Sequence, residues 1–227
     1  MIEARVISVG ALAAHPLWGE RAPVRTGHAT TTLIRSCDAV ILVDPGLPDE
    51  MVAARLGERA GITPAGVTHV FLTSFKPDVW RGVGAFDSAE WLIHEPEREA
   101  VGAALVAEVT RAKDAGDDEL AEALARDVAV LERCRPAPDA LAPKVDLFPL
   151  PGVTPGLCGL IIAGPRDTTV VCGDAIPTIE HLAEGKVPPV CADMAQAKES
   201  LMEAVEIADF LILGRDNLAP NPTRRAF

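Results

Sequence analysis

The sequence lacks the features that would point to a membrane or to nucleic acid. No segment approaches the ~20 consecutive apolar residues of a membrane span, and no cluster of Lys and Arg offsets the formal net charge of −12. A chain this acidic repels phosphate backbones and anionic lipid surfaces. The basic leader of a secretory signal is also missing, and Glu3 and Arg5 interrupt the apolar run of residues 1–14. We therefore expect a first β-strand there, and neither a membrane nor a nucleic acid as partner.

Cysteine pairs of the Cys-x-x-C type are absent as well. The five cysteines are an odd number, scattered along the chain. Such cysteines are typical of reduced core thiols in a cytoplasmic protein, so we expect that location and no disulfide framework. The cysteines are Cys37, Cys134, Cys158, Cys172 and Cys191.

The composition fits one large domain. With 227 residues, of which 48% are hydrophobic, the chain can bury a substantial core. No repeat, low-complexity tract or interdomain linker divides it. We predict a single domain, 1–227, with a helical pair within residues 95–134, a Pro-rich connector at 135–144 and a surface tail at 220–227.

Hydrophobic patterning favours an α/β sandwich. Short β-branched runs predict strands, and apolar residues spaced by three and four predict helices. The helix over residues 49–60 ends at Gly61, a common stop signal. Mostly apolar strands interspersed with helices indicate sheets covered by helices. The predicted strands are 4–9, 30–34, 40–43, 67–73, 91–94, 145–150, 157–162, 168–172 and 210–213, and the last predicted helix is 194–208.

Two stretches in the first half resemble signature blocks of the metallo-β-lactamase-fold hydrolases. Residues 30–34 and 41–46 are similar to the family's opening strands, which end in an Asp-containing turn, here Asp44-Pro45-Gly46. Residues 67–73 then lead into residues 74–79, Ser-Phe-Lys-Pro-Asp-Val, where the family has the metal-binding His-x-His-x-Asp-His. On that pattern the three histidine places are taken by Ser74, Lys76 and Val79, and Asp78 keeps the aspartate.

Three stretches in the second half extend the resemblance. Residues 150–156, Leu-Pro-Gly-Val-Thr-Pro-Gly, resemble the family's Gly-His-Thr-Pro-Gly, with Val153 at the histidine place. Residues 170–174 resemble the strand and Gly-Asp that supply a metal-bridging carboxylate, here Asp174. Residues 211–216 resemble a strand ending in Gly-His-Asp, with Arg215 at the last histidine place. The resemblance implies an αββα four-layer sandwich, and a pocket formed by Ser74, Lys76, Asp78, Val79, Val153, Asp174 and Arg215.

The replacements at the five histidine places oppose zinc binding. Zinc needs neutral imidazoles and carboxylates as ligands, and valine has no lone pair to donate. Arginine is always protonated, and lysine must lose its proton before it can ligate a metal. The remnant carboxylates, Asp78 and Asp174, are at most a weak Mg²⁺ or Ca²⁺ site. We therefore expect no zinc and no metal-activated hydroxide, and hence a hydrolytically inactive protein.

Charge balance gives the pocket a second expected property. Two bare carboxylates would repel, and one of them would tend to keep its proton. Lys76 and Arg215 bring the opposite charge to the same pocket. We predict contacts of salt-bridge length among Lys76, Asp78, Asp174 and Arg215. The protein would then either bind a small anionic molecule through Lys76 and Arg215 or have only a structural or partner-binding role.

Two other activities remain open from the sequence. A hydrolase of esters, thioesters or lactams could use a weak metal site or one rearranged around other residues, namely His15, His28, His69, His94, His181 and the cysteines. Alternatively, Ser74 and Lys76 could form a metal-free Ser-Lys pair, in which the lysine is the base for a serine nucleophile. Aspartates nearby would keep such a lysine charged, which opposes this role.

The sequence also predicts the surroundings of the pocket. We expect its mouth to be formed by His15, Trp18, His28 and Trp80, since the two histidines flank the loop of residues 16–27. The helical pair has an amphipathic surface that could pair with a copy of itself, which would make the protein a homodimer.

Overall fold

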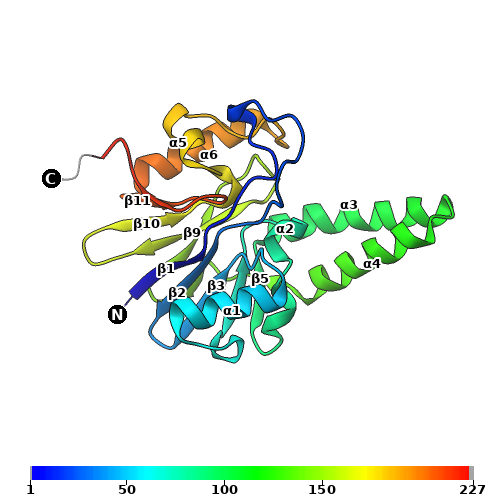
Figure 1. Ribbon diagram of the computed structural model, residues 1–227, viewed down its shortest axis with the longest axis horizontal. Helices are drawn as coiled ribbons and strands as arrows, with labels where there is room; N and C mark the ends of the chain where they lie inside the picture. The colour runs from blue at the N-terminus through cyan, green and yellow to red at the C-terminus, as the bar shows by residue number, and fades with distance from the viewer. Residues whose placement is uncertain (1, 225–227) are drawn as a thin grey trace.

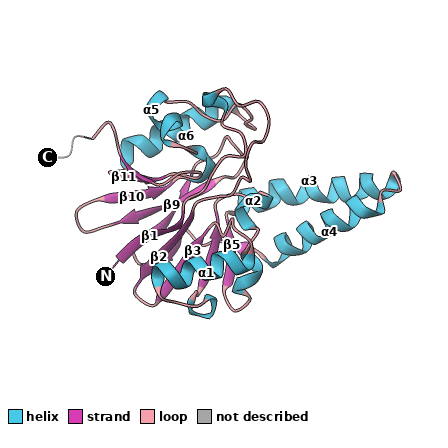
Figure 2. Ribbon diagram, in the orientation of Figure 1, coloured by secondary structure: helices cyan, strands magenta, loops and turns pink. Residues whose placement is uncertain are grey.

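The computed structural model describes residues 2–224. Two six-stranded sheets pack face to face, with helices on both outer faces (Figure 1, Figure 2). The predicted αββα sandwich is confirmed. Within residues 2–224, no helix combines the length and apolar character needed to cross a membrane.

The first sheet has the strand order β1-β2-β3-β4-β5-β6. β1 to β3 are antiparallel neighbours, whereas β3 to β6 run parallel. Each parallel step requires a crossover, and the crossover from β3 to β4 contains helix α1. The strands are β1 (Ile2–Ser8), β2 (Thr31–Ser36), β3 (Ala39–Val43), β4 (His69–Leu72), β5 (Glu90–Ile93) and β6 (Arg135–Pro136).

The second sheet has the order β12-β11-β10-β9-β8-β7 and one parallel pair, β10 with β11. Its edge strand β7 lies in the segment predicted to be a connector, which also contains β6, so that prediction is wrong in part. Both strands are short and lie at sheet edges, where Pro is tolerated. The strands are β7 (Ala140–Ala142), β8 (Val145–Pro149), β9 (Cys158–Ala163), β10 (Thr168–Val171), β11 (Phe210–Ile212) and β12 (Leu218–Pro220).

Local signals account for the ends of the main helices. α1 has Asp49 and Glu50 in its first turn and ends at Gly61 in the left-handed conformation. The Asp193 carboxylate caps α6 by accepting hydrogen bonds from two backbone N–H groups. The predicted tail begins within β12, and residues 225–227 lie outside the described residues. The helices are α1 (Asp49–Ala60), α2 (Pro77–Trp80), α3 (Glu95–Asp114), α4 (Asp118–Arg133), α5 (Ile179–Glu184) and α6 (Met194–Ile207).

Three apolar clusters fill the spaces between the layers. Inward-facing residues of both sheets, such as Phe71 and Leu160, form the central cluster. Val52 and Leu56 of α1 pack on the outer face of the first sheet, and Leu201 of α6 packs on that of the second. The cysteines fit the predicted core thiols only in part, because Cys37 is exposed.

The helical pair α3 and α4 projects from the sandwich as a hairpin (Figure 1). Its base is fixed by Glu97, whose buried carboxylate accepts hydrogen bonds from Phe75 N at 3.0 Å and Gly156 N at 3.1 Å. One carboxylate thus joins the loop after β4 to the loop after β8. Along the hairpin Val106 and Leu120 are exposed, and pairing with a second copy stays a prediction.

We predict that Gly156→Ala severely destabilises the fold. A Cβ at this position would lie 2.0 Å from Glu97 N and 2.4 Å from Glu97 Cα, so the base of the hairpin would have to move. Overpacking of this kind costs about 3 kcal/mol of unfolding free energy. Gly57→Ala is the control, because nothing lies within 4 Å of its Cβ in α1, and it should be neutral or stabilising. Urea denaturation of both variants checks this, and equal stabilities would contradict it.

Candidate functional site

The ends of parallel strands bring the predicted pocket residues together. Asp44 follows β3, and Lys76 and Asp78 lie at the start of α2, which follows β4, the parallel neighbour of β3. Asp174 follows β10, and Arg215 comes shortly after β11, again its parallel neighbour. Because parallel strands end at the same edge of a sheet, each sheet contributes a set of loops at one edge. The two sets meet where the sheets face each other.

A close backbone approach positions Arg215. Gly214 lies so near the turn after β10 that a Cβ on it would come within 2.2 Å of Gly173 O. Its N–H donates to Ile176 O at 3.1 Å, and Arg215 N donates to Pro177 O at 2.7 Å. Only glycine permits this contact, which aligns the Arg215 side chain with the neighbouring carboxylate.

The four predicted charges form one ion-pair cluster. Arg215 Nε donates to Asp174 Oδ1 at 2.7 Å and Nη2 donates to Asp174 Oδ2 at 3.0 Å. Nη2 also reaches Asp78 Oδ1 at 3.2 Å, and Nη1 bonds the other oxygen of Asp78. Lys76 Nζ contacts Asp174 Oδ2 at 2.8 Å. The predicted contacts of salt-bridge length are confirmed, and the guanidinium joins both carboxylates in paired geometry.

The cluster controls the ionisation of its members. Burial raises the pKa of Asp174, but the charges of Arg215 and Lys76 outweigh burial and hold that pKa well below its usual range. Burial lowers the pKa of Arg215, and the two aspartates outweigh it in turn. Asp174 is therefore ionised, and it is not a carboxyl that keeps its proton.

The buried carboxyl that favours its proton is Asp44, which the sequence did not single out as ionisable. Burial raises its pKa to about 7, although hydrogen bonds from Thr73 oppose the change. Thr73 N donates to Asp44 Oδ1 at 2.8 Å and Thr73 Oγ1 donates to Oδ2 at 2.7 Å. Asp174 raises this pKa further by repulsion.

The other three replaced positions provide no ligand atom to the pocket. Val79 and Val153 are buried in the apolar clusters of the first and second sheets. Ser74 is completely buried, and its hydroxyl oxygen has no hydrogen-bond partner among the described residues. Lys76 directs its ammonium to Asp174 and not to Ser74, so no Ser-Lys pair is assembled.

A cavity of about 330 Å³ lies beside the cluster. Lys76, Asp174, His181 and Glu20 supply its polar wall. The remaining wall is mostly apolar and is formed by Leu12, Ala14, Pro16, Pro177, Pro188, Pro189 and Val190. Convergent polar groups in an apolar cavity are the usual form of a small-molecule site.

The four predicted mouth residues occupy different places. We call residues 11–28 the strap, because Ala11 and His28 pair at its two ends. His15 and Trp18 of the strap line a second, smaller cavity next to the first. The His28 ring bonds backbone carbonyls at the strap's end. Trp80 stacks on Phe75 within the first sheet's cluster, so neither His28 nor Trp80 lines these two cavities.

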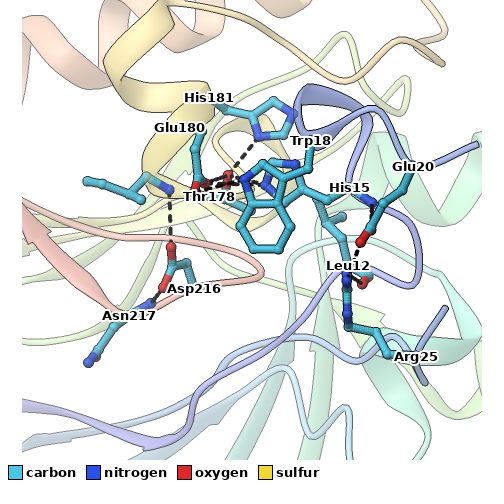
Figure 3. Close-up of polar contacts among 11 residues, drawn as sticks. Leu12, His15, Trp18, Glu20, Arg25, Thr178, Glu180, His181, Asp216 and Asn217 are labelled. Atoms are coloured by element: carbon cyan, nitrogen blue, oxygen red, sulfur yellow. Dashed lines mark hydrogen bonds and ion pairs between the residues drawn. The ribbon is translucent and has the colours of Figure 1, made fainter. Parts of the chain in front are cut away.

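Sequence reasoning missed the group of side chains that fixes the strap to the start of α5 (Figure 3). His15 Nε2 lies 3.1 Å from Thr178 Oγ1 and 3.2 Å from Glu180 Oε2. Thr178 Oγ1 also contacts His181 Nδ1 at 2.9 Å, while Trp18 stacks on His15. The Pro-Thr-Ile-Glu-His run that begins α5 was the only local signal, and its partner His15 is 163 residues away from Thr178.

The sandwich and its loop arrangement agree with the family comparison. The family model of the metallo-beta-lactamase superfamily matches residues 24–212, most of the chain. The chain belongs to this superfamily. No curated protein sequence matches it.

Solved structures of the superfamily share the fold at low sequence identity. A candidate metallo-beta-lactamase from Thermotoga maritima is 16% identical with a TM-score of 0.69, over 96% of this chain and 99% of that one. A candidate metal-dependent hydrolase from Staphylococcus aureus is 15% identical with a TM-score of 0.66, over 100% and 98%. AidC, a dizinc quorum-quenching lactonase, is 19% identical with a TM-score of 0.59, over 78% and 67%.

The residues present do not fit the zinc centre expected of this superfamily. The guanidinium of Arg215 occupies the carboxylate oxygens that a metal would need. Two of the histidine places hold valines in apolar clusters. Across residues 2–224, no group of three or more His, Cys, Asp or Glu side chains is arranged to hold a metal ion.

We predict that Arg215→Met lowers the unfolding free energy by about 3 kcal/mol, because it leaves buried carboxylate charge without its partner. Arg111→Met, on the exposed hairpin, should cost less than about 0.5 kcal/mol. Adding Asp174→Asn to Arg215→Met removes the uncompensated charge and should restore part of the loss. Chemical denaturation of the set tests this, and a double variant less stable than Arg215→Met would refute the ion-pair explanation.

Asp44 predicts a distinct pH dependence of stability. The unfolded chain releases this proton near the ordinary pKa of 3.8, whereas the folded protein keeps it until about 7. Between these values the folded state binds more protons, so stability falls as pH rises, by up to about 1.4 kcal/mol per pH unit. Asp44→Asn lacks this titration. The unfolding free energy of Asp44→Asn, measured by denaturation relative to that of wild type, should therefore increase from pH 5 to pH 7. A difference in unfolding free energy that stays constant over this range would contradict the assignment.

Proposed function

We propose that this protein is a metal-free member of the superfamily that does not hydrolyse substrates by the family's metal chemistry. The observation that carries the proposal is the Arg215 guanidinium, which bonds both Asp78 and Asp174. Lys76 adds a second positive charge at Asp174. Two cations therefore balance two carboxylates. A metal dication at the same place would be repelled by the charges of both Lys76 and Arg215.

The chemistry of the cluster supports a non-hydrolytic role. Zinc would supply a bound water with a pKa near ~7 and a Lewis acid, and neither Lys76 nor Arg215 can replace these functions while charged. A metal site rearranged around the other histidines and cysteines finds no support in the arrangement of residues 2–224. The buried, unpaired hydroxyl of Ser74 gives none to a Ser-Lys hydrolase.

The cavity supports a role in binding a small anionic molecule. Four of the five N–H groups of Arg215 are already directed at carboxylates. Lys76 uses one N–H on Asp174, and its side chain is 34% exposed. We therefore assign the contact with an anion to Lys76, and a supporting role to Arg215.

The cysteines support a reducing compartment such as the cytoplasm. All five are free. Burial raises the pKa of Cys134 and of Cys158 to about 12, so both remain unreactive thiols.

Metal content is the test of the proposed function. The protein is purified without chelator or affinity tag, and one sample receives added zinc before desalting. Both samples should contain less than about 0.1 equivalent of metal, because the ligands that would replace the water molecules around the ion are missing. Elemental mass spectrometry measures it. The variant His28→Gln/His69→Gln is the control, because it removes two histidines outside the pocket that could bind metal at the surface. One or two equivalents of metal that persist in this variant would overturn the proposal.

A further inference from the structure

The polar end of the cavity contains a second group, His181, that the ion-pair cluster does not use. His181 lies in α5, its side chain is buried, and its ring forms part of the cavity wall together with Lys76. The nearby Glu20 carboxylate is already bonded to Arg25 at 2.5 Å and to His15 N at 2.6 Å. Lys76 and His181 are therefore the groups left for an occupant of the cavity.

The hydroxyl of Thr178 determines which nitrogen of His181 carries the proton. Thr178 Oγ1 contacts Glu180 Oε2 at 2.7 Å, His181 Nδ1 at 2.9 Å and His15 Nε2 at 3.1 Å (Figure 3). A hydroxyl has one proton and two lone pairs, and an ionised carboxylate can only accept. The Thr178 proton therefore goes to Glu180, and His181 Nδ1 donates to Thr178, while His15 Nε2 lies within reach of both Thr178 Oγ1 and Glu180 Oε2. His181 carries its proton on Nδ1.

The other ring nitrogen, Nε2, is then an acceptor on a ring that lines the cavity. It has no hydrogen-bond partner among the described residues. Burial and the nearby His15 lower the pKa of His181, so the ring is neutral near pH 8 and its Nε2 lone pair is free.

We propose that Lys76 and His181 select a monoanionic organic acid that has a hydrogen-bond donor beside its acid group and an apolar body, such as a 2-hydroxy acid. The carboxylate accepts from Lys76 Nζ and the neighbouring hydroxyl donates to His181 Nε2. The apolar body lies against the wall around Leu12, Pro16 and Val190. This inference rests on the proposed function, because it takes the cavity to be a binding site free of metal.

The tautomer is tested without any ligand or variant. Nitrogen-15 NMR of the histidine rings at pH 8 should show His181 protonated at Nδ1 and unprotonated at Nε2. A proton on Nε2 would overturn the proposal, because the cavity would then present two donors and no acceptor.

The head group is tested by calorimetry at pH 8 in EDTA, with three probes of equal chain length. We expect 2-hydroxyoctanoate to bind about tenfold more tightly than octanoate, which lacks the donor, and than 1,2-octanediol, which lacks the charge. Equal affinities for 2-hydroxyoctanoate and octanoate, or no binding of any probe, would refute the selection.

Variants assign the two contacts. His181→Phe keeps the ring but removes the acceptor, and should reduce the affinity for 2-hydroxyoctanoate to that for octanoate. Lys76→Met should reduce the affinity for 2-hydroxyoctanoate to that for 1,2-octanediol. His69→Gln, on β4 and outside the cavity, is the control and should bind as wild type does. Full discrimination retained in His181→Phe would contradict the assignment. Because EDTA removes metals from the binding assay, a failure of the head-group selection can be distinguished from a failure of the metal-free proposal, which the metal content tests.

Discussion

The Arg215 guanidinium holds together loops from both sheets of the sandwich. Asp78 follows a strand of the first sheet and Asp174 follows a strand of the second, and Arg215 bonds both. A buried ion pair is a weak source of net stability, because desolvation offsets its Coulomb energy. Its stronger effect is to make each member necessary to the others. Neither carboxylate can be removed without leaving cationic charge uncompensated, which explains why both aspartates are compatible with a pocket that does not fit zinc.

The same balance adds to the effect of burial, which is the main cause of the raised pKa of Asp44. Lys76 and Arg215 together match Asp78 and Asp174, so a third ionised carboxyl would leave the region one negative charge in excess. Asp44 is buried and feels the repulsion of Asp174 more than the attraction of Arg215, which agrees with its raised pKa. Burial therefore dominates the raised pKa of Asp44, and the cluster reinforces it. Charge balance in this region involves five groups and not four.

Much of the fold could be predicted from the sequence because its signals are local. The helix over residues 49–60 has acidic residues in its first turn and a glycine after its last, and the structure has it at the predicted bounds. The charged contacts were predictable because the resemblance to the superfamily's metal-ligand blocks places Lys76, Asp78, Asp174 and Arg215 in one pocket. α5 was missed because six residues show no helical period. The proton on Asp44 and the role of His181 depend on burial and on distant partners, which no local pattern contains.

The cluster also decides what the cavity can recognise. Asp174 lines the cavity, but both its oxygens are occupied by Arg215 and Lys76, so it offers an occupant little acceptor capacity. The positive charge of Lys76 is partly offset by Asp174, which limits how strongly a simple anion can be held.

Selectivity must then come from a second, neutral contact, and His181 is the group whose position is fixed by the hydrogen bond of its Nδ1 with Thr178. Because Thr178 also contacts His15 of the strap, the hydrogen bond that orients His181 belongs to the same network that holds the strap over the cavity. The hydroxyl group of Thr178 therefore affects both the orientation of His181 and the position of the strap beside the cavity.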